Sequence, residues 1–177
     1  MVYDVIINGT SRTGKDTFID FVGDVLHGEV YVHNISSIDP FREIPIRFGW
    51  KGKKDDDYRT CLHLLKEAST YIDDFPTRFL LQERERVLQQ GSFLKDTMIF
   101  YHIREPKEIL SLMLRLPAVT TLLIKGSEEM GVLSSPSDAE VFQFNYDITI
   151  SNRGTLSELK TQAKLFLAEL KTIKGES

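Results

Sequence analysis

The sequence has a single cysteine, Cys61, among its 177 residues, so no disulfide can form within the chain. One thiol is compatible with a reducing compartment, and its place in an apolar helical pattern predicts that Cys61 is buried. No apolar run approaches the roughly 18 to 20 residues that span a bilayer, and the first residues lack the cationic and apolar regions of a secretory signal. We therefore expect a soluble, cytoplasmic protein without a membrane partner.

The sequence also lacks an excess of positive charge, since 22 Lys and Arg face 26 Asp and Glu, for a net charge of −4. This balance argues against a nucleic-acid partner. Only the scattered cations of residues 42–59 favour such a partner. Neither an internal repeat nor a low-complexity tract interrupts the chain, and its length suits one domain with a substantial core. We expect a single domain over residues 1–177 and leave its oligomeric state open.

What the sequence does contain is a glycine-bracketed loop near its start, Gly-Thr-Ser-Arg-Thr-Gly-Lys-Asp-Thr at residues 9–17. It follows a β-branched run and precedes apolar residues at helical spacing, the context in which the G-x-x-x-x-G-K-[ST] pattern cradles phosphates. The glycines let successive N–H groups converge on phosphate oxygens at the positive end of a helix. Lys15 would reach the terminal phosphates; the alternative is an ordinary turn with Lys15 solvated.

Asp16 departs from this pattern, because a Ser or Thr usually stands there and holds Mg²⁺. A carboxylate can bind the metal directly or through water, and beside a polyphosphate it needs the cation more than a hydroxyl does. We expect Asp16 to be a metal ligand. The predicted nucleotide-binding set in the loop is Gly9, Thr10, Ser11, Arg12, Thr13, Gly14, Lys15, Asp16 and Thr17.

Short apolar runs rich in β-branched and aromatic residues predict five strands. They lie at about 2–8, 29–35, 97–103, 119–125 and 146–151. Helical patterns alternate with them, which indicates a parallel sheet covered on both faces, with ligands bound beyond the carboxyl ends of its strands.

Two segments exceed what such connections need. Residues 36–92 predict several helices, one of them with an apolar face of Cys61, Leu62, Leu65, Ala68 and Ile72, and we interpret this insertion as substrate-binding. Residues 126–145 have no periodicity and are either a mobile lid or a long surface loop.

Residues 14–17, 37–43, 100–108 and 146–156 together resemble the P-loop nucleotide-kinase superfamily. The chain is most similar to the phage-type and bacterial deoxynucleoside monophosphate kinase-like proteins. This resemblance implies a three-layer α/β fold, with a five-stranded parallel sheet of order 2-3-1-4-5 and helices on both faces. It further implies ATP and Mg²⁺ as cofactors, Asn152 beside the nucleotide base and Arg104 in the active site. Related kinases commonly have an acidic residue where this chain has His102.

Asp39 and Arg104 are the predicted catalytic residues besides Lys15. Asp39, before Pro40, is either a helix N-cap or a strand-end carboxylate that orients the acceptor phosphate or holds Mg²⁺, and we favour the second. Arg104 can bind phosphate bidentately; the alternative is a surface ion pair with Glu105 or Glu108.

Transfer between two anions requires several cations. We single out Arg42 and Arg47 as substrate-binding residues, with Arg78 in the next helix, and expect Lys51, Lys53, Lys54 and Arg59 to be solvated. Lys125, at the end of the fourth strand, either contacts the transferring phosphate or is a solvated strand end. His102 is either a satisfied strand histidine or a sign that the protein binds ATP without transferring phosphate.

These features predict transfer of the γ-phosphoryl group from ATP to a small phosphorylated acceptor, with a (deoxy)nucleoside monophosphate as the first choice. Activity like that of dephospho-CoA kinase or phosphomevalonate kinase is an alternative within the same class. A non-catalytic ATP-binding module is the alternative from another class.

Overall fold

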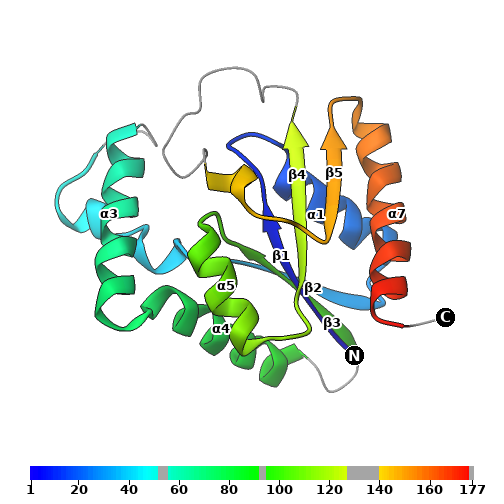
Figure 1. Ribbon diagram of the computed structural model, residues 1–177, viewed down its shortest axis with the longest axis horizontal. Coiled ribbons are helices and arrows are strands. Elements are labelled where there is room, and N and C mark those ends of the chain that lie inside the picture. Colours follow the sequence, from blue (N-terminus) through cyan, green and yellow to red (C-terminus); the bar gives the residue numbers. More distant parts are fainter. Residues whose placement is uncertain (52–55, 92–94, 127–139, 176–177) are drawn as a thin grey trace.

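A five-stranded parallel sheet forms the centre of the molecule, in the order β2-β3-β1-β4-β5 (Figure 1). The structure is a computed structural model that describes residues 1–51, 56–91, 95–126 and 140–175. The strands are β1 (Val2–Asn8), β2 (Val30–Ser36), β3 (Asp96–His102), β4 (Thr120–Gly126) and β5 (Ile148–Asn152). All five predicted strands and their predicted order are thus confirmed.

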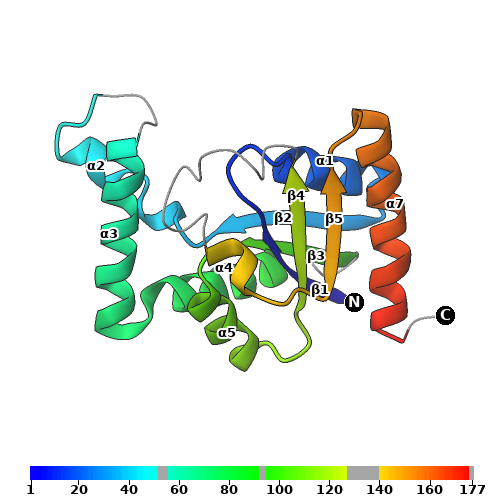
Figure 2. The same cartoon turned by 45° about the horizontal axis from the view of Figure 1, so that its top comes forward.

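Helices cover both faces of the sheet (Figure 2). They are α1 (Lys15–Val25), α2 (Ile44–Arg47), α3 (Asp56–Asp73), α4 (Phe75–Gly91), α5 (Pro106–Arg115) and α7 (Leu156–Ile173), with short 3₁₀ turns η1 (Asp39–Phe41) and η2 (Val141–Gln143). Pro106 begins α5, where its missing N–H costs nothing. Thr155 and Glu158 form a capping box at the start of α7.

Alternate side chains of β1 divide the core into its two halves. Val5 and Ile7 pack towards α1 and α7, where the Phe18 and Phe166 rings meet edge to face at 5.5 Å. Ile6 points the other way, into the cluster formed with α4 and α5. Each such fully buried side chain contributes roughly 1.5–3 kcal/mol to folding. The short, unalternating apolar runs of β1, β3 and β4 therefore correspond to strands buried on both faces.

A buried polar contact fastens α4 to the sheet. Arg84 donates from Nε and Nη2 to the two carboxylate oxygens of Asp4 on β1, both at 2.9 Å. The Tyr101 hydroxyl of β3 donates to the same carboxylate at 2.6 Å. Because Asp4 is buried, these three donors replace the water that its charge would otherwise need.

Helix α3 stands at one end of the molecule and packs against α2, α4 and η1 rather than the sheet (Figure 1). Its buried face consists of Tyr58, Leu62 and Lys66. The predicted apolar face was right for Leu62 and Leu65, which pack in an apolar cluster with Tyr58. It was wrong for Ala68 and Ile72, which are exposed, while Cys61 is half-buried. A helix that covers other helices at one end needs a narrower apolar stripe than one lying across the sheet.

The long insertion between β2 and β3 does contain helices, as predicted: η1, α2, α3 and α4. The predicted lid or surface loop at 126–145 lies mostly outside the described residues. Within the described part of the chain, no helix is long and apolar enough to cross a membrane.

Candidate active site

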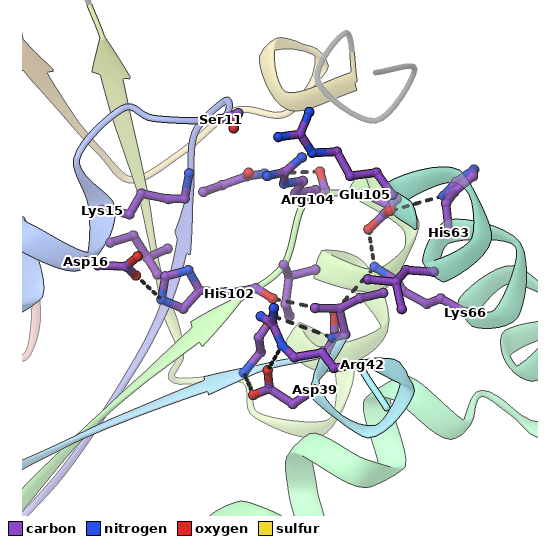
Figure 3. A pocket seen from close by; sticks show the side chains of 18 of the residues that line it. Ser11, Lys15, Asp16, Asp39, Arg42, His63, Lys66, His102, Arg104 and Glu105 are labelled. Carbon is purple, nitrogen blue, oxygen red and sulfur yellow. Dashed lines mark hydrogen bonds and ion pairs between the residues drawn. The ribbon is translucent and has the colours of Figure 1, made fainter. Parts of the chain in front are cut away.

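A cavity of about 560 Å³ opens at the carboxyl ends of β1, β2 and β3 (Figure 3). The glycine-bracketed loop between β1 and α1, here called the phosphate loop (residues 9–17), forms one wall. Residues of η1 and α3 form the opposite wall. The predicted residues Ser11, Arg12, Lys15, Asp16, Asp39, Arg42 and Arg104 all line this cavity.

Two glycines allow the phosphate loop its path. Gly9 and Gly14 have φ angles of +148° and +83°, which side-chain-bearing residues rarely adopt. A Cβ on Gly9 would lie 2.5 Å from the Ile124 carbonyl oxygen, and one on Gly14 would lie 2.5 Å from Asn152 Nδ2. The loop is therefore packed closely against β4 and the end of β5.

Lys15 lies inside the loop and helps to hold its shape. Its ammonium donates to the carbonyl oxygens of Gly9 and Thr10, each at 2.7 Å. Asn152 Nδ2 donates to the Thr13 carbonyl oxygen at 2.9 Å from the other side. Asn152, predicted beside the nucleotide base, is thus placed against the loop backbone.

The two predicted metal ligands differ in their surroundings. Both carboxylate oxygens of Asp39 are engaged, one by the Ser36 backbone N–H at 2.8 Å and the other by Arg42 Nε at 2.7 Å. Asp39 does not cap η1, so the N-cap interpretation was wrong. The Asp16 carboxylate, by contrast, is 86% exposed at the cavity.

The carboxylates Asp16 and Asp39 fit a Mg²⁺ site only if phosphate oxygens of the bound nucleotide supply further ligands. Among the residues that the structure describes, no three His, Cys, Asp or Glu side chains converge on a metal position. Mg²⁺ at phosphoryl-transfer sites is commonly bound by one or two carboxylates together with substrate phosphates and water. Asp16, exposed next to the phosphate loop, suits that arrangement, and Asp39 suits it less.

His102 ends β3 and lies beside Asp16, with its Nε2 3.8 Å from Asp16 Oδ1. Burial lowers the pKa of the imidazole to about 4, against the opposing effect of the Asp16 charge. The ring is therefore neutral at physiological pH. Its Nε2 atom is buried and has no hydrogen-bond partner within the described part of the chain, so His102 is not the satisfied strand histidine of the simpler prediction.

Arg104 follows β3 and lines the cavity between the phosphate loop and α3. Its backbone carbonyl accepts a 3.1 Å hydrogen bond from Asn8 Nδ2, which also lies 2.7 Å from the Tyr146 hydroxyl. Asn8 Oδ1 accepts from the Gly9 N–H at 2.7 Å. Sequence analysis missed Asn8 and Tyr146, although an amide directly before the first loop glycine was a usable signal.

A buried cluster of Lys66, Glu105 and Glu108 lies at the α3 end of the cavity, and sequence analysis missed it too. Lys66 Nζ bonds to Glu105 and lies 2.6 Å from Glu108 Oε2. The carboxylates expected to compete for Arg104 are thus paired with Lys66. The position of Lys66, four and eight residues after Leu62 and Tyr58, was the available signal, since that spacing places it on the buried face.

The charges of this cluster shift one another's pKa values. Burial would lower the pKa of Lys66, but the two carboxylates raise it. Burial would raise the pKa of Glu105, but the Lys66 ammonium lowers it. Burial, with the Glu105 charge, raises the pKa of Glu108 to about 7 despite Lys66. Lys66 and Glu105 therefore form the charged pair, and Glu108 holds a proton to near neutral pH.

The predicted substrate cations lie in different places. Arg42 lines the cavity, and so does Arg59, which was expected to be solvated. Arg47 is exposed and faces Glu43 at 3.7 Å, and Arg78 pairs with Asp73 at 2.6 Å. Neither they nor Lys125 belong to the described lining of the cavity.

No protein-family model matches the chain, and no curated protein sequence matches it significantly. Solved structures do match it over nearly its whole length. Shikimate kinase from Aquifex aeolicus shares 14% identity, with a TM-score of 0.52, over 96% of this chain and 97% of its own. A sugar kinase from a Janibacter species shares 17% identity, with a TM-score of 0.53, over 98% of each chain. The chain has the α/β fold of these P-loop kinases.

Proposed function

We propose that this protein is an ATP- and Mg²⁺-dependent kinase that phosphorylates a small, already phosphorylated acceptor. One observation carries the proposal: the phosphate loop with Lys15 and the cations Arg42, Arg59 and Arg104 line the same cavity of about 560 Å³. That volume is in the range of small-molecule sites. The likeness in fold to two kinases supports this class of reaction.

In this proposal, the chain acts mainly by positioning and neutralising charge. The loop backbone and Lys15 bind the donor phosphates, and Lys15 exchanges its carbonyl partners for phosphate oxygens. Arg104, between the two walls, faces the transferring group. Mg²⁺, when bound at Asp16, supplies positive charge to the donor phosphates. An acceptor phosphate is already anionic near neutral pH, so no general base is required.

A (deoxy)nucleoside monophosphate is the acceptor that we propose first. Arg42 and Arg59 line the wall that η1 and α3 form, here called the acceptor wall, and they pair there with Asp39 at 2.7 Å and with Asp56 at 3.0 Å. In this proposal the two guanidinium groups exchange these carboxylates for the acceptor phosphate. Tyr58 and Leu62 line the same wall and offer apolar surface to a planar base. Dephospho-CoA and phosphomevalonate are also phosphorylated acceptors and belong in the same panel.

The test is to incubate the purified protein with ATP, Mg²⁺ and each acceptor while ADP release is followed. Turnover on a nucleoside monophosphate supports the proposal. Turnover on another acceptor alone corrects the acceptor and keeps the class.

A non-catalytic ATP-binding module is the second candidate, and neutral His102 is the observation that favours it, because no anionic side chain stands at the end of β3 beside Asp16. Thermal stabilisation by ATP and Mg²⁺ without turnover on any acceptor would support this second candidate.

Lys15→Ala is expected to abolish ATP-dependent thermal stabilisation in either case, because the loop loses the charge that faces the phosphates. Lys160→Ala is the matched control, since Lys160 lies on α7 and pairs with Asp24 at 3.1 Å. Retained ATP binding in Lys15→Ala would refute the role of the phosphate loop.

A further inference from the structure

The polar atom of the site that most needs explanation is His102 Nε2. It is buried without a hydrogen-bond partner among the described residues. The Oδ1 atom of the Asp16 carboxylate lies 3.8 Å from it. A buried polar atom without a partner costs free energy comparable to a lost hydrogen bond. In the tautomer that carries the ring proton on Nε2, this position calls for an acceptor when the site is assembled.

Asp16 can supply that acceptor with little movement. Its side chain is exposed and unconstrained by burial, whereas His102 is held in the last position of β3 between Ile7 and Ser36 of the neighbouring strands. Shortening 3.8 Å to an ordinary hydrogen bond of about 2.9 Å requires a shift of about 1 Å. Lys15, Asp39 and Arg104 are the other charged groups that act on the ring.

We propose that His102 is a positioning residue, which donates from Nε2 to the Asp16 carboxylate and orients its other oxygen towards the metal of a bound nucleotide. The inference rests on the proposed function, since it needs ATP and a metal ion. P-loop NTPases hold Mg²⁺ with a loop hydroxyl and a separate acidic residue. Here the acid is on the loop, and the adjacent strand end carries a neutral donor.

The pairing of His102 with Asp16 therefore explains two departures from the usual P-loop pattern: an acid at position 16 and a histidine at the end of β3. In the usual arrangement, a hydroxyl occupies position 16 and a nearby acid supplies the carboxylate at the metal. In this chain Asp16 itself supplies that carboxylate and His102 is neutral, so each arrangement places one carboxylate at the metal. A second carboxylate beside Asp16 would add repulsion next to the donor phosphates. Hydrogen bonds to metal-binding carboxylates of this kind change metal affinity or activity by about 10- to 100-fold when removed.

The test measures ATP affinity with Mg²⁺ and with EDTA, so it does not depend on turnover. In wild type, Mg²⁺ tightens ATP binding. His102→Phe, which keeps a ring but removes the donor, should reduce that tightening by about tenfold. Affinity in EDTA should change less than about twofold. His102→Gln, which restores an N–H donor, should recover most of the effect, and His33→Phe on β2 is the control for loss of a histidine.

A double-mutant cycle separates positioning from packing. In the Asp16→Asn background, His102→Phe should have no further effect on the Mg²⁺ dependence, because the carboxylate that it orients is gone. Electron paramagnetic resonance of Mn²⁺ with the protein and ATP gives the metal affinity directly. Thermal unfolding shows that each variant folds, and His102→Leu serves where His102→Phe does not.

Four outcomes would overturn the inference. If His102→Phe lost as much ATP affinity in EDTA as in Mg²⁺, or lost the same Mg²⁺ dependence in the Asp16→Asn background, His102 would contribute only through packing. Unchanged Mg²⁺ dependence in His102→Phe would refute the inference while leaving the proposed function intact. Wild-type protein that binds no ATP in the presence of Mg²⁺ would overturn the proposed function and this inference together.

Discussion

Glu108 is a fully buried carboxyl group whose protonation the fold changes. Burial, reinforced by Glu105, raises its pKa from 4.5 to about 7. The unfolded chain ionises Glu108 near pH 4.5, while the folded chain keeps it protonated to about pH 7. The folded state therefore binds the extra proton in this window, and the contribution of Glu108 to stability falls as the pH rises from about 4.5 to 7.

Glu108→Gln should make the pH dependence of stability flatter between about pH 4.5 and 7, because it removes the group whose ionisation the fold opposes. The difference in free energy of unfolding between the variant and wild type should change by roughly 1–3 kcal/mol across this pH range. Urea denaturation at several pH values measures it. Glu85→Gln, at an exposed position of α4, is the control.

The Lys66 ammonium lowers the pKa of Glu105. Glu105 therefore affects the pH dependence of stability only below about pH 4.5, where stability is lost as its carboxylate gains a proton. A wild-type profile that is already flat from pH 5 to 7, or a Glu108→Gln profile as steep as that of wild type, would contradict the assignment.

At the scale of the element, α4 depends on one polar contact as well as on its apolar face. Arg84→Met removes both hydrogen bonds to Asp4 and leaves a buried carboxylate with the Tyr101 hydroxyl. We expect a loss of about 2–4 kcal/mol in the free energy of unfolding, since breaking a buried ion pair strands its partner. Urea denaturation measures this loss.

Adding Asp4→Asn to Arg84→Met should recover part of that loss, because the stranded charge is removed as well. Arg86→Met, at an exposed position two residues further along α4, is the matched control and should cost less than about 1 kcal/mol. A double variant less stable than Arg84→Met alone would show that the contact acts mainly through packing.

The elements also show where sequence patterns succeed. Strands β1, β3 and β4 were predictable because each is a short apolar run buried on both faces, whereas the edge strands β2 and β5 are partly exposed and were recognised from their β-branched and aromatic residues. The capping box of Thr155 and Glu158 marks the start of α7. The buried face of α3 was not predictable from apolar spacing, because its centre is Lys66, whose burial depends on Glu105 and Glu108 about 40 residues away. Local periodicity carries no information about such a distant partner.

At the scale of the whole molecule, the sheet order followed from a resemblance, and the fold agrees with it. The phosphate loop was predictable from consecutive residues. The wall formed by η1 and α3 was predictable only in part. Arg42 lines the cavity as expected, whereas the places of Arg59 and Lys66 in the lining became apparent only from the structure. The proximity of Asp16 and His102 joins positions 86 residues apart, a relation that no local motif contains.

The contact between Asn152 and the loop has a consequence for how the site comes into being. The loop occupies the first tenth of the chain, yet its Thr13 carbonyl is held from the last strand, and Gly9 packs against the Ile124 carbonyl of β4. During synthesis from the N-terminus, the loop emerges long before either support. If nucleotide binds this loop as proposed, we expect it to stabilise the chain only after residue 152 has been synthesised, because the loop lacks these two supports until then.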